Sequence, residues 1–177
     1  MKITIQPYDP AWPSLFEQEK ARLMDALRGH VTSIQHIGST SVPGLGAKPI
    51  IDIMIGVPSL AEADEFCIQP IIELGYEYVP AFEAETPERR FFRKETNGAR
   101  THHIHLVEIN SPWWVDHLLF RDYLRGSQAA RRAYEAHKRE LAEREWESSN
   151  QYSEAKTDCI LKLMEEARAW RASVCYC

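Results

Sequence analysis

The sequence predicts an α+β fold, in which a mixed β-sheet with flanking helices is followed by a C-terminal layer of helices. Strand-like and helix-like segments are interleaved over about residues 1–110, whereas about residues 111–172 have helical periodicity throughout. No segment has the composition of a linker, and there is no internal repeat. We therefore expect one domain over residues 1–177, which is long enough to bury a proper core.

The N-terminal third predicts one helix and two strands. Asp9 and Pro10 form a helix cap and first-turn pair, and the helix is expected to end near Gly29. Residues 31–37, VTSIQHI, predict a strand. Residues 49–57, PIIDIMIGV, are apolar almost throughout, so we expect a central strand that is covered on both faces.

The rest of the chain predicts further helices and strands. A helix over residues 59–75 should be interrupted by Pro70. Three strand-like runs follow, YEYVP, RRFFRKE and THHIHLVE, and then three helical runs, PWWVDHLLFRDYLRG, SQAARRAYEAHKRELAERE and SEAKTDCILKLMEEARAW. The charged second helix is interpreted as a solvated surface with i,i+4 ion pairs.

Composition limits the classes of partner. The net charge is −5, from 21 basic and 26 acidic residues, which gives no general attraction to nucleic acids. No apolar run approaches the ~18 residues that a membrane span needs, and the N-terminus has no signal-peptide pattern. We expect a cytoplasmic protein with a small-molecule partner, and neither a nucleic-acid nor a membrane partner.

The four cysteines show no CxxC spacing. Cys67 and Cys159 lie among apolar neighbours and are expected to be buried thiols. Cys175 and Cys177 are expected to belong to a frayed end without a function.

A turn-forming stretch, GSTS, lies between the first two predicted strands. Gly38 allows a tight turn or a close backbone approach, and Ser39, Thr40 and Ser41 supply hydroxyl groups. Such a turn presents N–H and O–H groups to an anion, most naturally the phosphates of a nucleotide. Lys48, in the loop beyond, is either a phosphate contact or a solvated charge.

A single carboxylate, Asp52, lies inside the apolar strand. Because an unpaired buried charge is very costly, a functional role is favoured over a structural one. Twelve residues separate Asp52 from Ser39, which suits a hairpin-like return that brings the acid beside the turn. A carboxylate there can hold Mg²⁺ against phosphates.

Three histidines gather on the run THHIHLVE. In an extended strand His103 and His105 share one face and His102 points to the other. With Asp52 they would form a set of two imidazoles and one carboxylate, which suits Zn²⁺, Mn²⁺ or Fe²⁺ more than Mg²⁺. For His103 and His105, a role in metal binding or acid–base chemistry is favoured as strongly as a role in simple hydrogen bonding. Arg100, just before this strand, either lines an anion pocket or is an exposed strand-end charge.

Near the C-terminus, Tyr152 and Lys156 are expected to lie on one helical face, four residues apart. Lys156 either contacts a triphosphate or carboxylate substrate or forms a structural ion pair.

Four blocks of the sequence resemble the GrpB family: YDPAWPSLFEQE, HIGSTSVPGLGAKPIIDIMIGV, THHIHLVE, and LLFRDYLR with YSEAKTDCI. The resemblance implies the nucleotidyltransferase superfamily fold, whose signature is a Gly-Ser turn followed by a strand with an acid-x-acid pair. Related domains occur fused to dephospho-CoA kinase. Gly38 and Ser39 match the turn and Asp52 matches one acid, but Met54 or Ile50 occupies the place of the other.

The resemblance and the motifs together predict a nucleotidyltransferase-like protein that binds a nucleotide or phosphorylated small molecule with a divalent metal. Nucleotidyl transfer is the candidate reaction, and Mg²⁺ or Mn²⁺, with Zn²⁺ as an alternative, is the candidate metal. A binding module without turnover, or a metal-dependent enzyme of different chemistry, are the alternatives. The predicted catalytic and metal residues are Asp52, His103 and His105, and the predicted phosphate or nucleotide contacts are Gly38, Ser39, Thr40, Ser41, Lys48, Arg100 and Lys156.

Overall fold

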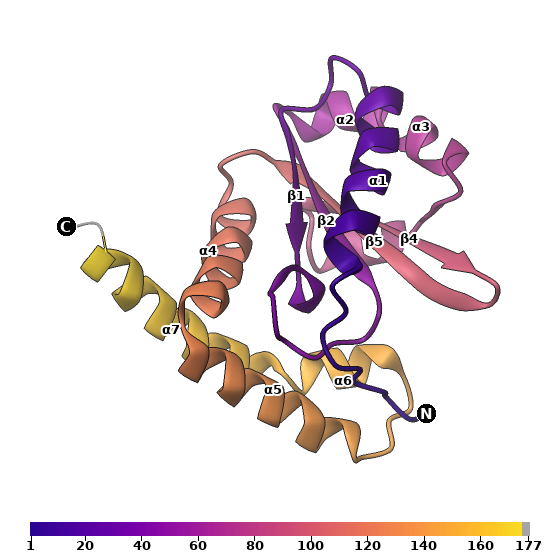
Figure 1. Cartoon of the computed structure of the whole chain (residues 1–177). Helices are drawn as coiled ribbons and strands as arrows, with labels where there is room; N and C mark the ends of the chain where they lie inside the picture. Colours follow the sequence, from indigo (N-terminus) through magenta and orange to yellow (C-terminus); the bar gives the residue numbers. More distant parts are fainter. Residues whose placement is uncertain (175–177) are drawn as a thin grey trace.

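A computed structural model describes residues 1–174 and shows a sheet part and a helical part side by side (Figure 1). Both predicted parts are confirmed. The elements in chain order are α1 (Trp12–Ala26), β1 (Ser33–Ile37), η1 (Ser39–Ser41), β2 (Ile51–Val57), α2 (Leu60–Phe66), α3 (Ile68–Glu73), β3 (Glu77–Tyr78), η2 (Pro80–Ala84), β4 (Arg89–Thr96), β5 (Ala99–Glu108), α4 (Pro112–Gly126), α5 (Gln128–Ala142), α6 (Ser149–Glu154) and α7 (Thr157–Val174).

The sheet has five strands in the order β1-β2-β5-β4-β3. Strands β2 and β5 run parallel, and the other neighbours pair antiparallel. The expected interior position of β2 is therefore confirmed. Its register places Asp52 beside Ile37 on one side and beside His103 on the other, so three segments far apart in the sequence meet at one point of the sheet.

The two faces of β2 have different neighbours, because successive side chains of a strand alternate. The face that carries Ile51, Ile53 and Ile55 packs on Trp12, Phe16 and Leu23 of α1 in the main core. The opposite face carries Asp52 and Met54, and Met54 packs with Trp114 of α4. A side chain at Gly56 would overlap the Trp114 ring, so this residue lets α4 approach the sheet closely.

Helices α4, α5 and α7 form their own apolar cluster, and it includes Val42 and Leu45 from the loop after η1. Tyr134 of α5 and Met164 of α7 are buried in this cluster. The helical part is thus fixed to the loop that joins β1 and β2, and α5 and α6 lie next to that loop (Figure 1). No helix in residues 1–174 is long and apolar enough to cross a membrane.

The interpretation of the α5 region as a solvated surface is only half right. The expected i,i+4 pairs Glu135–Arg139 and Glu140–Arg144 are present. Tyr134, Lys138 and Leu141, however, are buried. Tyr134 packs in the apolar cluster with α4, α7 and the loop after η1, and Leu141 packs with Ile3 and Tyr152.

Two predicted helices are each divided in two. The helix over residues 59–75 breaks at Cys67, ahead of the expected position at Pro70, so that Pro70 falls in the first turn of α3, where a missing N–H costs nothing. The C-terminal run is α6 and α7 with a turn between them. Tyr152 belongs to α6 and Lys156 lies in this turn, so they do not share a helix, although the Lys156 ammonium still lies over the Tyr152 ring.

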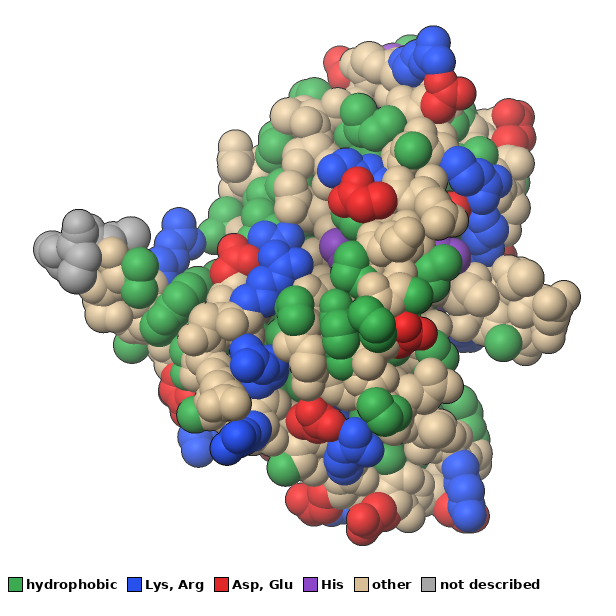
Figure 2. All heavy atoms as spheres, in the orientation of Figure 1, with side chains coloured by type: hydrophobic (Ala, Val, Ile, Leu, Met, Phe, Trp, Pro, Cys, Tyr) green, Lys and Arg blue, Asp and Glu red, His purple; other side chains and the backbone are tan. Residues whose placement is uncertain are grey.

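Cys67 is fully buried as expected, and Cys159 is partly buried. Cys175 and Cys177 lie outside the described residues. On the face shown in Figure 2, basic and acidic side chains are interspersed with apolar ones and form no continuous basic stripe.

Candidate functional site

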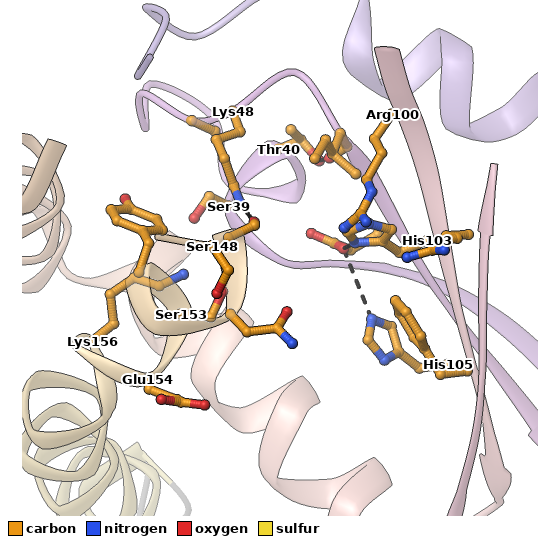
Figure 3. A pocket seen from close by; sticks show the side chains of 18 of the residues that line it. Ser39, Thr40, Lys48, Arg100, His103, His105, Ser148, Ser153, Glu154 and Lys156 are labelled. Atoms are coloured by element: carbon orange, nitrogen blue, oxygen red, sulfur yellow. Dashed lines mark hydrogen bonds and ion pairs between the residues drawn. The ribbon is translucent and has the colours of Figure 1, made fainter. Parts of the chain in front are cut away.

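A cavity of about 650 Å³ opens between the sheet and the helical part (Figure 3). Asp52, His103 and His105 come from the sheet, and Lys138 and Lys156 come from the helical part. Although the chain as a whole is acidic, the cavity lining holds six cationic side chains against three acidic ones: Lys48, Arg89, Arg93, Arg100, Lys138 and Lys156 against Asp52, Glu85 and Glu154. A lining of this charge suits an anionic ligand.

The Gly-Ser turn is built around the Asp52 carboxylate. Gly38 has φ +71°, which favours glycine, and a Cβ at this position would overlap Asp52 Oδ2 and lie 3.0 Å from Asp52 Cβ. The turn is closed by the Ser41 hydroxyl, which donates to the Gly38 carbonyl at 2.6 Å. The predicted hairpin-like return is therefore confirmed: the strand acid lies directly against the turn.

Asp52 contacts two imidazoles on β5. His103 Nδ1 lies 3.1 Å from Asp52 Oδ1, and His105 Nε2 lies 3.8 Å from the same oxygen (Figure 3). Burial by itself would raise the pKa of Asp52, but the contacts with His103 and His105 outweigh it and hold that pKa far below its usual range. The Asp52 side chain, 26% exposed, is thus an ionised carboxylate at the wall of the cavity.

His105 is neutral, because burial lowers its pKa to about 4 against the opposing pull of Asp52. Arg89 Nη1 lies 3.3 Å from His105 Nδ1. Since a guanidinium only donates, Nδ1 must be the acceptor, and this assigns the proton to Nε2, which faces Asp52. In this tautomer His105 has no free lone pair on the cavity side.

His103 has the opposite tautomer. The ionised carboxylate of Asp52 can only accept, so the proton lies on His103 Nδ1. In the neutral imidazole this leaves the lone pair on His103 Nε2, which is buried without a hydrogen-bond partner within residues 1–174. The Asp52 carboxylate thereby fixes the orientation of the ring.

The predicted metal set fits only in part. Among residues 1–174 no group of three or more His, Cys, Asp or Glu side chains is arranged to hold a metal ion. The hydrogen bond from Arg89 to His105 gives one reason, because His105 Nε2 carries a proton. Asp52 and His103 Nε2 keep free lone pairs, so a metal site here stays a prediction that rests on these two residues.

Met54 and Ile50, the two apolar residues that could occupy the position of the missing acid, have different surroundings. Met54 is fully buried beside Trp114, so a carboxylate there would be cut off from solvent. Ile50 is half-buried and lines the cavity. Its backbone carbonyl accepts from the Thr40 hydroxyl at 3.1 Å.

Three lysines meet on the other side of the cavity. Lys138 Nζ donates to Ser39 Oγ at 3.0 Å and to the Gly46 carbonyl. Lys48 Nζ donates to Ser149 Oγ at 3.2 Å. Lys48 and Lys156 also lie over the Tyr152 ring, with Nζ at 5.3 and 4.9 Å from its centroid.

In the protein without a ligand, the protonated form of these lysines is destabilised, as their lowered pKa values show. Burial, together with the charge of Lys156, lowers the pKa of Lys138 to about 7, and burial, together with the charge of Lys48, lowers the pKa of Lys156 to about 8. The pKa of Lys48 is lowered mainly by burial. Within residues 1–174 none of the three forms an ion pair, so the structural ion pair considered for Lys156 is not seen there.

The remaining predicted residues divide between cavity and scaffold. Ser39, Thr40 and Arg100 line the cavity, whereas Gly38 and Ser41 do not. Thr40 is bonded to His36 Nε2 at 3.0 Å, and Arg100 reaches Glu95 at 3.5 Å.

Lys138 and Arg89 were missed by the sequence reasoning. For Lys138 a signal exists: it falls on the same helical stripe as the apolar residues Ala130, Tyr134 and Leu141. A lysine inside an apolar stripe is unusual and marks a buried amine. For Arg89 no local signal exists, because its burial depends on η2 and α4.

Comparison with known proteins gives a family model described as "GrpB protein", which matches residues 2–166. The YqkA protein of Bacillus subtilis is 38% identical over 96% of this chain, and the chain spans 48% of that protein. A "Glutamate-rich protein GrpB" of Alkalihalophilus pseudofirmus is 33% identical over 93% of this chain and 95% of its own length. A dephospho-CoA kinase of Mycolicibacterium paratuberculosis is 30% identical over 80% of this chain and 40% of its own length.

Two solved structures are similar in fold. The GrpB protein from Enterococcus faecalis has a TM-score of 0.82 and 35% identity, covering 94% of this chain and 99% of that one. The Cid1 poly(U) polymerase, solved with Mg and 3′-dATP bound, has a TM-score of 0.52 and 13% identity over 77% of this chain and 44% of that one. At this identity the second likeness concerns the fold alone, and it agrees with the predicted nucleotidyltransferase-like α+β fold.

Proposed function

Because the chain belongs to the GrpB family and has a nucleotidyltransferase-like fold, we propose that it binds a nucleotide or another phosphorylated small molecule in the central cavity. The phosphates would lie against Lys48, Lys138 and Lys156, near the Ser39 hydroxyl.

The observation that carries this proposal is a group of three lysines, of which Lys138 is buried and Lys48 and Lys156 are half-buried, with no ion pair to a carboxylate among residues 1–174. Buried charges in proteins are normally paired, because an unpaired one forfeits its hydration. Here Lys156 lowers the pKa of Lys138, and Lys48 lowers the pKa of Lys156. A polyanion bound among them would supply the missing charge, and ammonium groups are common phosphate ligands.

Asp52 and His103 would form the reactive end of the site. His103 Nε2 has a free lone pair and an orienting carboxylate, so it can accept a proton from a hydroxyl group of a bound molecule. A divalent metal held by Asp52 and His103 would offset the charge of the phosphates. His105 would keep its hydrogen bond from Arg89, with its Nε2–H directed at Asp52 Oδ1 3.8 Å away.

Nucleotidyl transfer is a second candidate, and the position of Asp52 in the fold favours it. Asp52 lies beside the Gly-Ser turn, as the first or second acid does in the superfamily signature. The fold is shared with a polymerase that was solved with Mg and 3′-dATP bound. The apolar residues Met54 and Ile50 mean that the full acid pair is missing.

Isothermal titration calorimetry with the four nucleoside triphosphates and inorganic triphosphate tests the binding. Each is titrated with Mg²⁺, Mn²⁺ or Zn²⁺ and with a chelator, and candidate acceptors are then added to look for released pyrophosphate. We expect saturable binding that Lys138→Met weakens and that Arg144→Met, at an exposed position just after the end of α5, leaves unchanged. Equal affinity in the wild type and Lys138→Met would overturn the phosphate site.

A further inference from the structure

The cavity has a second charged end, where the guanidinium of Arg89 lies among aromatic rings. Its Cζ is 5.9 Å from the Phe82 centroid, 5.2 Å from that of Phe91 and 6.0 Å from that of Trp113. Phe82 and Phe91 also line the cavity. This end lies on the η2–β4 side and is distinct from the lysine cluster.

Arg89 has no ion pair within residues 1–174, in contrast to the other arginines of the same hairpin. Arg90 pairs with Asp64 at 2.7 Å, Arg93 with Glu77 at 2.7 Å, and Arg100 with Glu95 at 3.5 Å. The one hydrogen bond found for Arg89 runs from Nη1 to the neutral His105. A half-buried guanidinium with no counter-charge is energetically unfavourable, so a missing anion is indicated.

The free part of Arg89 has a definite shape. In the pair of Arg93 with Glu77, Nε and Nη2 each donate to one carboxylate oxygen at 2.7 Å. The same Nε–Nη2 edge of Arg89 is free, and its Nε is buried without a hydrogen-bond partner in the described chain. Two parallel N–H groups match the two oxygens of a carboxylate.

From these observations we propose that Arg89 binds a carboxylate of a second ligand, through its Nε–Nη2 edge, with Phe82 and Phe91 against the group that bears it. One guanidinium matches the single negative charge of a carboxylate. The aromatic walls favour a planar or apolar group next to the carboxylate. His105 connects this end to Asp52, because it accepts from Arg89 and lies 3.8 Å from Asp52 Oδ1.

The proposal needs only the geometry of Arg89, so it can fail or hold independently of the phosphate site. The test uses the whole chain labelled with ¹⁵N and follows the arginine Nε–Hε signals by NMR. Benzoate is the probe, benzamide is its neutral analogue, and sodium chloride keeps the ionic strength equal. The spectrum of Arg89→Lys identifies the Arg89 signal, and that of Arg93→Lys identifies the Arg93 signal.

We expect benzoate to shift the Arg89 Nε–Hε signal saturably while benzamide leaves it in place. The Arg93 signal is the matched control, because Glu77 already occupies its edge. Arg89→Lys, which keeps the charge but loses the planar edge, should weaken benzoate binding about tenfold or more, as loss of a charged hydrogen bond of ~1.5–3 kcal/mol implies.

Three outcomes would overturn the proposal. If benzoate moved no arginine Nε–Hε signal of the wild-type protein, the proposal would be wrong, whether or not Arg89→Lys folds. Equal benzoate affinity in Arg89→Lys would place the carboxylate elsewhere. Displacement of benzoate from Arg89 by inorganic phosphate would assign this end to a phosphate instead.

Discussion

Two buried lysine environments lie on opposite faces of the same sheet, and they differ in one respect. Lys94 of β4 donates to Glu19 Oε1 of α1 at 2.9 Å, and the Tyr76 hydroxyl donates to the same oxygen at 2.9 Å. Lys138 on the other face has a hydroxyl and a carbonyl as acceptors but no carboxylate. The first lysine has its counter-charge within the fold, whereas the second lacks one.

This difference distinguishes charged side chains that stabilise the fold from charged side chains that are left to bind a ligand. In the Glu19 network the contacts with Lys94 and Tyr76 outweigh burial and lower the pKa of Glu19, so folding stabilises the ionised form. In the lysine cluster burial dominates and the pKa values of the amines fall. The paired network should therefore contribute to stability, and the unpaired cluster should contribute to binding at a cost in stability.

The largest expected effect tests the paired side of this comparison. Lys94→Met leaves the Glu19 carboxylate, which is 6% exposed, without its buried partner, although the half-exposed Arg22 still pairs with its other oxygen at 2.9 Å. A buried pair broken from one side costs up to ~3–5 kcal/mol, and the remaining pair with Arg22 should place the loss at or below the lower end of that range. Urea denaturation should show that loss of unfolding free energy, with Arg28→Met, in an exposed pair, as the control. A loss below ~1 kcal/mol would contradict the structural role of the network.

The unpaired side should respond in the opposite sense. Lys138→Met removes a buried charge without orphaning another, so the free energy of unfolding should stay the same or rise. Triphosphate binding should weaken about tenfold or more, because a hydrogen bond to a charged group contributes ~1.5–3 kcal/mol. Calorimetry and urea denaturation of the same variant measure the two effects. A variant that loses stability and keeps affinity would reverse the assignment.

The pH dependence sharpens the comparison further. The pKa of Lys138 falls from its ordinary value of 10.5, which applies to the unfolded chain, to about 7 in the folded protein, so the unfolded chain binds more protons between these values. Stability of the free protein should therefore rise with pH from about 7 towards 10.5. Urea midpoints across this range should show the slope in wild type, reduced in Lys138→Met. A slope unchanged by the substitution would assign it to other groups.

Ligand affinity should follow the reverse trend, because phosphate binding needs protonated amines. The pKa values of Lys138 and Lys156 are about 7 and 8 in the free protein. Triphosphate affinity should fall as the pH rises from 6.5 to 9, while proton uptake accompanies binding at pH 8. Titrations in buffers of different ionisation enthalpy measure that uptake, and zero uptake would argue that the amines stay uncharged.

The smallest effect concerns the turn. Ser39→Ala removes the hydroxyl that accepts from Lys138 Nζ and leaves the Gly46 carbonyl in place. Loss of one such bond should change stability by ~0.5–1.5 kcal/mol. Differential scanning calorimetry should resolve the change in Tm. A drop as large as that of Lys94→Met would mean that Ser39 supports the fold rather than the ligand.

Much of the fold and half of the site could be predicted from local pattern. The apolar run around Asp52 indicated a central strand, and the two-residue period of a strand placed His103 and His105 on one face. Both features depend only on residues that are neighbours in the sequence, so the local pattern is enough to predict them. The spacing from Ser39 to Asp52 indicated the return of the chain for the same reason.

The rest depends on contacts between distant segments. Lys138 is buried because the stripe of α5 that carries it docks on η1 and the loop that follows it. Its hydrogen-bond partner there, Ser39, lies 99 residues earlier in the sequence. No proline or glycine marks the turn that places Lys156 between α6 and α7. The tautomer of His105 depends on Arg89, which is sixteen residues away in the neighbouring strand. Periodicity and propensity hold no information on these contacts.

The long separations that build the cavity also bear on the order in which the chain folds. Lys138 reaches Ser39 across 99 residues, Lys48 reaches Ser149 across 101, and Arg125 reaches the Ser41 carbonyl across 84. Contacts of such high order form late, because loop closure must precede them. During synthesis, the half of the cavity on the sheet part leaves the ribosome before the helices that close it. The protein should therefore acquire its binding capacity in the last step of folding, after most of the sheet has formed.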